Sequence, residues 1–323
     1  MGVIPDNQKP RIEEWAKTVS HPIPLRYAVT GHPADDSIKA FVTELSEIAE
    51  CIQPKQDSDT EAARPSLFIG DQVTYQAIPL DRELDLFLSA LSNPSAFAAQ
   101  IEPEVKEQLD LLRIPAMVKV YITSHCPFCP ATVTLLLGLA GYSEQVRLTV
   151  IDGTLFPEAA EEDRVQSAPT LILDDAFRWT GSVNPMELVT LMLDRNPADL
   201  GPDALRAMIE NGDADGVARL MAGHNQIFPA FLALLAHPRW SVRLGAMVVF
   251  EILGEDNPDL AKKIVPLIVD IFPGADPSVR GDLLHVLGES KNPAALSFLE
   301  EVMQTETDSE VREAANEAME KLM

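Results

Sequence analysis

The sequence predicts an α/β region followed by an all-α region, with the boundary near residue 196. Two observations support this prediction. One order of strands and helices occurs twice between residues 24 and 196. Beyond Leu193 only amphipathic helical patterns remain, and a Val-Arg pair recurs in them at spacings of 37 and 32 residues. A chain of 323 residues is also too long for one ordinary hydrophobic core.

The first copy covers residues 24–93 and follows a polar N-terminal extension at residues 1–23. Its expected strands lie at Pro24–Thr30, Arg64–Gly70 and Val73–Ile78. A helix is expected after the first strand, from Gly31 to Ala49, and another after the third, at Arg82–Leu91. A loop rich in Asp, Ser and Gln separates the first helix from the second strand. Residues 94–117 then connect the copies, with a helix expected over Pro103–Leu112.

The second copy covers residues 118–196. Its expected strands lie at Val118–Thr123, Val146–Ile151, Ala168–Leu173 and Phe177–Thr180. Its expected helices run from the cysteine motif through Leu139, over Glu158–Val165 and over Pro185–Leu193. Residues 65–88 align with residues 169–192 at an offset of 104, and Tyr27 aligns with Tyr121 at an offset of 94. At the second offset, His-Pro-Ala-Asp at 32–35 takes the place of Cys-Pro-Phe-Cys at 126–129. The first copy therefore keeps the frame and lacks the thiols.

The segment Val118–Pro130 carries the chemistry of the chain. It predicts a strand, a short turn and a helix that opens with Cys-Pro-Phe-Cys, with Pro127 at the first helical position. Unpaired N–H groups and the positive end of the dipole at a helix N-terminus stabilise a thiolate. We therefore expect Cys126 to be the exposed nucleophile of a redox-active dithiol and Cys129, one turn inside, to be the resolving thiol.

A metal site is the rival interpretation of this cysteine pair. Structural zinc and iron–sulfur sites need four Cys or His ligands, usually as two close pairs, and the sequence holds no second pair. No Gly-x-Gly-x-x-Gly follows a strand, so no nicotinamide or flavin cofactor is expected in this chain. Electrons must then come from another protein or from a small thiol.

Composition limits the partners and the compartment. The net charge of −25 argues against binding to nucleic acid phosphates and to anionic lipid. No apolar run is long enough to span a bilayer, and charged residues interrupt the N-terminus, so we expect no membrane segment and no signal peptide. Three cysteines do not form a secreted disulfide framework, which predicts a reducing, cytoplasmic compartment.

The order of strand, Cys-Pro-Phe-Cys and helix, followed by Ala168-Pro169-Thr170 before a strand, resembles the thioredoxin fold. A degenerate first unit and an active second unit resemble two relatives, the glutaredoxin-like protein disulfide oxidoreductases and the N-terminal domain of the alkyl hydroperoxide reductase flavoprotein. This resemblance covers residues 24–196. It implies that Pro169 is cis and packs beside the dithiol, leaving backbone groups free for a substrate strand. The substrate contacts that it implies are Pro169, Ala168, Pro127, Phe128 and His125.

Some residues depart from the thioredoxin pattern or leave alternatives open. Thioredoxins carry a buried acid six positions before the first Cys, where this chain has Val120, so the proton acceptor for the second thiol would be water or another group. His125 either raises the thiolate fraction of the first thiol or is a solvated turn residue. Cys51 is expected to be a buried, inert thiol. His32 and Asp35 are expected to serve a turn and a helix start.

Residues 197–323 resemble HEAT-like repeats, in which helix pairs stack into a solenoid. Besides the Val-Arg pair, a Leu-Gly-Glu triplet recurs 34 residues apart, and we expect about three repeats from Asp203 onward. The Val-Arg pairs place Arg243, Arg280 and Arg312 in a ladder. We expect these arginines to pair with acids of neighbouring repeats, Asp276 and Asp308 among them, rather than to bind an acidic ligand.

Together these features predict a thiol–disulfide oxidoreductase that acts on protein or mixed disulfides, with the HEAT-like repeats recruiting a partner. Its expected partners are a disulfide-bearing client protein and a separate electron donor, either a reductase or a small thiol. The alternative is a non-enzymatic, redox-sensing scaffold whose dithiol state controls what the repeats bind. Multiple turnover separates the two hypotheses, because a sensor does not reduce its partner repeatedly.

Overall fold

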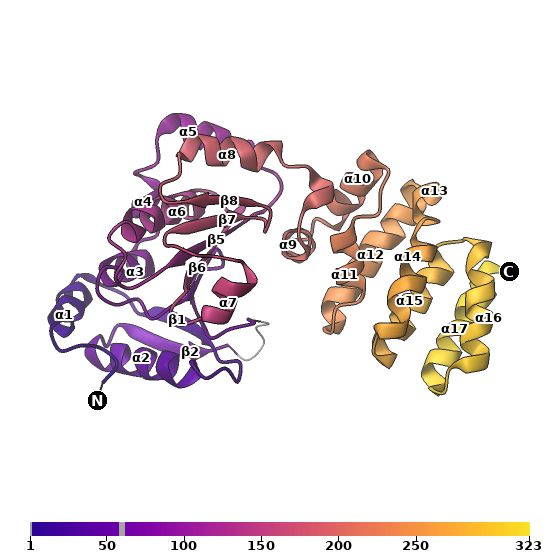
Figure 1. Ribbon diagram of the computed structural model, residues 1–323, viewed down its shortest axis with the longest axis horizontal. Coiled ribbons are helices and arrows are strands. Elements are labelled where there is room, and N and C mark those ends of the chain that lie inside the picture. The colour runs from indigo at the N-terminus through magenta and orange to yellow at the C-terminus, as the bar shows by residue number, and fades with distance from the viewer. Residues whose placement is uncertain (1, 58–61) are drawn as a thin grey trace. The chain divides into compact units, whose positions relative to one another are not determined.

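An eight-stranded sheet runs through the first of the two units into which the chain divides, Met1–Asp194 and Arg195–Met323. We describe both units from a computed structural model that covers residues 2–57 and 62–323 (Figure 1). The strand order is β2-β1-β3-β4-β6-β5-β7-β8. The strands are β1 (Ile23–Ala28), β2 (Ile52–Gln56), β3 (Ser66–Ile69), β4 (Val73–Gln76), β5 (Ala116–Ile122), β6 (Val146–Asp152), β7 (Thr170–Leu173) and β8 (Phe177–Thr180).

The two halves of this sheet repeat one another. In each half the first strand pairs in parallel with the second and antiparallel with the third, and the third pairs antiparallel with the fourth. Helices α2 (Asp35–Ile48) and α6 (Cys129–Tyr142) both have 14 residues and start 94 positions apart, which is the offset read from the sequence. The predicted duplication is therefore confirmed. The parallel pairing of β4 with β6 joins the halves into one sheet.

Strand β2 corrects the prediction of a loop after the first helix. Residues 58–61 of that expected loop lie outside the described residues, but Ile52–Gln56 pairs with β1 at the edge of the sheet. Only Ile52 of the strand is buried, so the sequence shows no alternation of apolar and polar residues that would predict this strand. Pro54 is tolerated because an edge strand has one side without a hydrogen-bonding partner strand.

Helices cover the sheet and enclose its core. The remaining helices of this unit are α1 (Lys9–Thr18), α3 (Leu84–Ser92), α4 (Ser95–Ala98), α5 (Pro103–Leu109), α7 (Pro157–Glu162) and α8 (Pro185–Asp194). Alternate side chains of β5 enter two clusters: Val120 packs in the large core that includes α6, and Tyr121 packs with Phe156 next to α7. A Cβ on Gly141 would lie 2.8 Å from the carbonyl oxygen of Pro94, so glycine permits the close approach of α6 to the segment before α4.

The second unit is entirely helical. Its α-helices are α9 (Pro202–Glu210), α10 (Ala214–His224), α11 (Pro229–Leu235), α12 (Trp240–Asp256), α13 (Pro258–Ala261), α14 (Ile264–Ile271), α15 (Pro277–Glu289), α16 (Leu296–Thr305) and α17 (Ser309–Leu322). Helices α10, α12, α15 and α17 pack side by side in that order, and α9, α11, α14 and α16 each pack against at least one of them. This arrangement is the predicted stack of helix pairs. Among the described residues, no helix is long and apolar enough to cross a membrane.

The arginine ladder bridges repeats, but through acids other than those expected. Arg243 pairs with Asp282 at 2.5 Å, and Arg280 pairs with Glu306 at 2.8 Å. The expectation for Asp308 is wrong because its carboxylate accepts N–H groups at the start of α17. Asp276 stands at the corresponding position before α15 and pairs with none of the three arginines. Arg312 is exposed and has no acidic partner within the described part of the chain.

Candidate active site

The cysteine pair lies in the short connection between β5 and α6. Cys126 and Cys129 form a disulfide, with their Cα atoms 5.6 Å apart. The helix begins at Cys129, and Pro130 rather than Pro127 lies in its first turn. The prediction that Pro127 takes the first helical position is therefore wrong. Residues 127 and 128 form a bend instead, and the N–H of Cys129 donates to the Sγ of Cys126.

The two sulfurs have different surroundings. The Sγ of Cys126 accepts a hydrogen bond from the N–H of Cys129 at 3.1 Å and lies 3.4 Å from the carbonyl oxygen of Ala168. Cys126 is 7% exposed and Cys129 is 0% exposed. In the disulfide form Cys126 is therefore buried rather than exposed as expected, although it is slightly less buried than Cys129. After reduction, the N–H of Cys129 would favour a thiolate on Cys126.

The peptide bond between Ala168 and Pro169 is cis, as predicted. The carbonyl oxygen of Pro169 accepts the N–H of Gly181 at 2.9 Å, so it is occupied within the sheet. The carbonyl of Ala168 faces Cys126, and its N–H makes no hydrogen bond to any residue that the structure describes. Ala168, rather than Pro169, therefore has a backbone group beside the disulfide that no described residue occupies.

The other expected substrate contacts surround the disulfide at the surface. Phe128 is 71% exposed, and Pro127 beside it is exposed as well. His125 is exposed, and its Nδ1 lies 2.9 Å from the hydroxyl of Ser124. This contact favours the interpretation of His125 as a solvated turn residue. Contact of these three residues with a substrate remains a prediction.

In the first half, the His-Pro-Ala-Asp segment at 32–35 takes the place of the cysteine motif, and hydrogen bonds rather than a disulfide hold its conformation. The carboxylate of Asp35, at the position of Cys129, accepts the N–H groups of Thr30 and Gly31 at distances from 2.7 to 3.2 Å. His32 Nδ1 accepts the N–H of Ala34 at 3.0 Å. The predicted roles of His32 and Asp35 in a turn and a helix start are confirmed. The motif holds a fixed loop and offers no redox chemistry.

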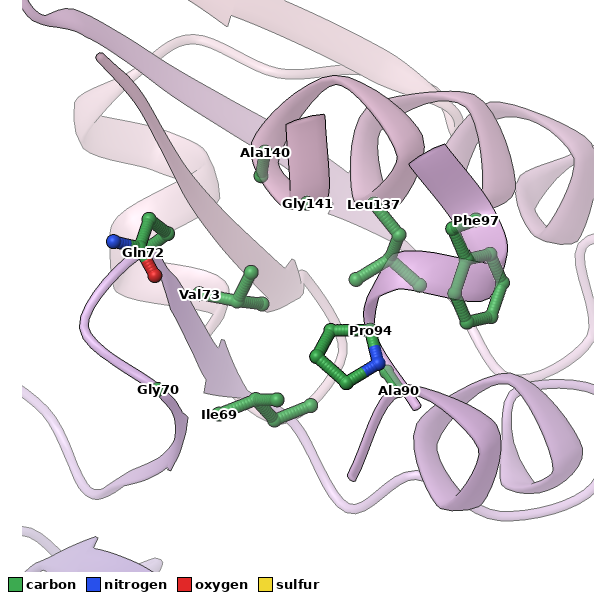
Figure 2. Close-up of a pocket in the computed structure, with 10 residues that line it drawn as sticks. All are labelled: Ile69, Gly70, Gln72, Val73, Ala90, Pro94, Phe97, Leu137, Ala140 and Gly141. Atoms are coloured by element: carbon green, nitrogen blue, oxygen red, sulfur yellow. The ribbon is translucent and has the colours of Figure 1, made fainter. Parts of the chain in front are cut away.

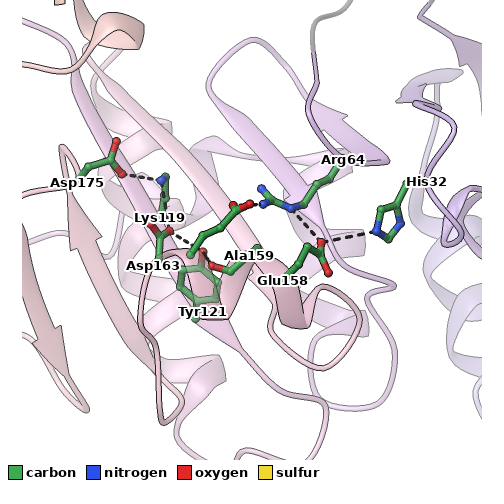
Figure 3. Close-up of polar contacts among 9 residues, drawn as sticks. His32, Arg64, Lys119, Tyr121, Glu158, Ala159, Asp163 and Asp175 are labelled. Carbon is green, nitrogen blue, oxygen red and sulfur yellow. Dashed lines mark hydrogen bonds and ion pairs between the residues drawn. The ribbon is translucent and has the colours of Figure 1, made fainter.

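This loop contacts the active half through α7 (Figure 3). Glu158 of α7 lies 3.6 Å from His32 Nε2 and accepts a hydrogen bond from Arg64 at 3.1 Å. Arg64 also pairs with Glu162, and the His32 ring packs on Phe156 with centroids 5.2 Å apart. Residues that precede β3 and α2 in the first half thus hold a helix of the second half. Sequence reasoning missed this contact because it joins positions about 94 to 126 apart.

The C-terminal end of α7 is fixed to β5 by a second set of polar contacts (Figure 3). The Tyr121 hydroxyl lies 2.5 Å from Asp163 and 2.9 Å from the carbonyl oxygen of Ala159, and Lys119 pairs with Asp163 and Asp175. Burial, followed by the hydrogen bond to Asp163, raises the pKa of Tyr121 far above its usual value. Burial alone would lower the pKa of Lys119, but the two carboxylates outweigh it and the pKa rises. Tyr121 therefore stays neutral and Lys119 stays charged.

A buried acid in the first half carries no sequence signal. Glu83, just before α3, is 3% exposed, and neither carboxylate oxygen has a hydrogen-bond partner among the described residues. Burial raises its pKa to about 7. Sequence comparison matched Glu83 only to Glu187, which is exposed. Val120, at the position of the thioredoxin acid, is fully buried in the apolar core.

The remaining thiol and an apolar hollow of the sheet region lie apart from the disulfide chemistry. Cys51 is free and half-buried rather than buried, and burial raises the pKa of its thiol, which lowers its reactivity. A cavity of about 60 Å³ lies at the seam of the two halves, lined by Val73, Phe97, Leu137 and their neighbours (Figure 2). Leu137 is eight residues along α6 from Cys129, roughly 12 Å at 1.5 Å per residue. No cluster of three or more potential metal ligands occurs in the described residues.

Comparisons with known proteins agree with this architecture. Residues 116–193 match the thioredoxin domain family, and residues 228–320 match the HEAT repeat family. A structure of a protein disulfide oxidoreductase from Aeropyrum pernix k1 has a TM-score of 0.50 at 16% identity, covering 59% of this chain and 93% of that one. This similarity supports the fold of the first unit.

Relatives of greater length match the chain in part. An alkyl hydroperoxide reductase of Pseudomonas putida is 23% identical over 186 residues, 56% of this chain and 36% of the relative. A domain of alkylhydroperoxide reductase AhpF from Enterococcus faecalis (V583) has a TM-score of 0.47 at 18% identity and covers 58% of this chain and 99% of that one. The chain spans between about a third and a half of the length of the curated relatives. It carries a thioredoxin-like α/β region followed by HEAT repeats.

Proposed function

We propose that this chain is a thiol–disulfide oxidoreductase of a reducing, cytoplasmic compartment that acts on protein or mixed disulfides. One observation carries the proposal: Cys126 and Cys129 are bonded at the start of α6, and Cys126 is the less buried of the two. The N–H of Cys129 and the helix N-terminus supply the positive potential that a nucleophilic thiolate requires. Exposed Phe128 and the free N–H of Ala168 supply a surface for the client.

The reaction proceeds by two exchanges. The Cys126 thiolate attacks one sulfur of the client disulfide, the client S–S bond breaks, and one client thiolate leaves while a mixed disulfide forms. The Cys129 thiolate then attacks the Cys126 sulfur and releases the second client thiolate. The client gains two electrons and two protons, and the chain is left with the Cys126–Cys129 disulfide. A separate reductase or a small thiol returns the dithiol form.

We further propose that the HEAT repeats recruit the client or the electron donor. Stacked helix pairs present an extended surface of the kind that repeat proteins use for binding. Recruitment of this kind requires a surface of identifiable chemistry on the repeats.

A trapping experiment tests the redox assignment. Cys129→Ser removes the resolving thiol, so we expect client proteins to accumulate as mixed disulfides on Cys126 and to be released by added dithiol. Cys126→Ser is the matched control and should trap nothing. The full chain should also reduce an insulin-like disulfide over many turnovers. Absence of both trapping and turnover would leave the sensor hypothesis, provided that binding to the repeats changes with the dithiol state.

A further inference from the structure

Helix α12 exposes a stripe of large apolar side chains. Trp240 is 59% exposed, and Leu244 and Val248 are each 40% exposed. Their spacing of four residues places them on one face of the helix, one turn apart. Buried residues of the same helix, such as Val249 and Leu253, face the packed interior of the repeats. Three exposed large side chains in a row are a typical mark of a binding surface.

The stripe continues into acidic residues on the same face. At 100° per residue, positions 240, 244, 248, 251 and 255 fall within an arc of about 80°. Glu251 and Glu255 are exposed, and neither forms an ion pair with any other residue in the described ranges. The face therefore has an apolar segment of roughly 12 Å followed by an acidic segment of roughly 6 Å, at 1.5 Å per residue.

Acidic residues of the neighbouring helix α15 pair with cations of the repeats. Asp282 holds Arg243 and Glu289 holds Lys321. Arg243 and Lys321 are thus engaged within the repeats, and we expect a binding partner to supply the charge that complements Glu251 and Glu255.

We propose that the α12 stripe (Trp240, Leu244, Val248, Glu251 and Glu255) binds a basic amphipathic helix. The partner helix presents apolar side chains at positions i, i+4 and i+8, and Lys or Arg one to two turns further on. The apolar contacts provide the affinity, and the charges fix the direction of binding. This inference rests on the proposed recruitment of a partner, and it names the surface and the partner's chemistry.

A peptide probe tests the surface on the full-length chain. The probe is a synthetic helix of roughly 18 residues with three leucines at these spacings and two lysines beyond them. Its matched control carries glutamates in place of the lysines. At about 0.15 M salt, which screens long-range attraction, we expect the lysine peptide to shift the tryptophan emission of the chain to shorter wavelength, because Trp240 becomes covered, and to bind at least roughly tenfold tighter than the glutamate peptide. Equal binding of the two peptides would overturn the proposal.

Substitutions separate the stripe from general attraction to an acidic protein. Leu244→Asp should weaken the lysine peptide at least roughly tenfold, with Leu244→Ala as a milder variant. Glu251→Lys with Glu255→Lys should reverse the preference toward the glutamate peptide. Glu300→Lys with Glu301→Lys makes the same charge change at exposed positions of α16 and should leave binding unchanged. If this control pair weakens binding as much as the α12 pair, net charge alone explains the attraction and the proposal fails.

Turnover of a small mixed disulfide, measured in the same variants, distinguishes this inference from the redox assignment. We expect it to be unchanged, since the dithiol belongs to the first unit and α12 to the second. Peptide binding without turnover in the unsubstituted chain would remove the proposed enzyme activity and leave the surface. Turnover without peptide binding would remove the proposed surface and leave the enzyme activity.

Discussion

Cys126 and Cys129 are three residues apart and differ in almost every property that sets thiol reactivity. Cys126 is 7% exposed and its sulfur accepts an N–H from the helix start, whereas Cys129 is 0% exposed. A thiolate is the reactive form, and a buried thiol in apolar surroundings ionises with difficulty. The environment therefore separates the two thiols into an attacking and a resolving group.

Alkylation rates of single-cysteine variants check this separation. In reduced Cys129→Ser protein we expect Cys126 to react with iodoacetamide at least roughly tenfold faster than Cys129 does in Cys126→Ser protein. The pH profile of the faster reaction should have its midpoint below the ordinary Cys value of about 8.5. Similar rates in the two variants would contradict the asymmetry. Cys51 is common to both variants and serves as the internal reference.

Glu83 gives a prediction for stability against pH. Its pKa is about 7 in the folded chain, against an ordinary value of 4.5 when unfolded. Between these values the folded state binds the proton more tightly. The stability that Glu83 gives the folded state through this proton is therefore complete below pH 4.5 and is lost as the pH rises through about 7. The total loss in the free energy of unfolding is about 3 kcal/mol.

Unfolding by urea at a series of pH values tests this sign. Glu83→Gln should flatten the decline in the free energy of unfolding between pH 4.5 and 7 relative to the unsubstituted chain. Glu187→Gln changes the aligned, exposed residue of the second half and should leave the decline in place. If the free energy of unfolding of Glu83→Gln still declines over this pH range, other titrating groups cause the decline.

At the scale of elements, α7 is held at both ends by contacts from other segments. Tyr121 binds its C-terminal end, and the chain then runs through residues 164–167 to Ala168 beside Cys126. Tyr121→Phe leaves Asp163 without this donor, so we expect a loss of about 1–2 kcal/mol in the free energy of unfolding. Hydrogen exchange of residues 157–168 should rise with it.

Tyr27→Phe is the control for that substitution. Tyr27 occupies the same register in the first half, and its hydroxyl makes no hydrogen bond to the residues that the structure covers. We expect a change close to zero. Equal losses in the two variants would show that the hydroxyl of Tyr121 does not hold α7.

The Val-Arg motif offers a matched test within the repeats. The side chain of Arg243 is 4% exposed, pairs with Asp282 and donates to the carbonyl oxygens of His237 and Pro238. Arg243→Ala leaves a partly buried carboxylate and two carbonyls without their donor, so we expect a loss of about 3–5 kcal/mol. Arg312→Ala, in the same motif but exposed, should change stability by less than about 0.5 kcal/mol.

Hydrogen exchange of α12 and α15 is the appropriate measurement, because a chain of two units need not unfold in one step. Faster exchange in Arg243→Ala and unchanged exchange in Arg312→Ala are the expected results. Unchanged exchange in both would mean that the inter-repeat pair contributes nothing measurable.

At the scale of the whole molecule, both cysteines and the Ala168 carbonyl beside them belong to the first unit. We therefore expect residues 1–196 alone to reduce a small mixed disulfide as fast as the full chain. Toward a client trapped by Cys129→Ser, kcat/KM should fall at least roughly tenfold without the repeats, equivalent to about 1.4 kcal/mol. Equal rates toward that client would contradict recruitment by the repeats.

Local and periodic signals in the sequence were sufficient for much of this description. The cysteine pair between a strand and a helix, the constant offsets of the duplication and the recurring Val-Arg pairs depend on residues near one another or on regular spacing, whereas the cis bond at Pro169 was implied by the resemblance to the thioredoxin fold. Such patterns can be recognised in the sequence alone, because the residues of each element itself determine them.

The tertiary structure decided what depends on distant partners. The pairing of β4 with β6, the polar edge strand β2, the contacts of His32 and Arg64 with α7 and the burial of Glu83 all join segments that are far apart in the chain. An acid such as Glu83 is the same residue in solvent and in a core, and only the surrounding apolar atoms raise its pKa. For the same reason, the α12 stripe became visible only when packing showed which apolar side chains stay outside the core.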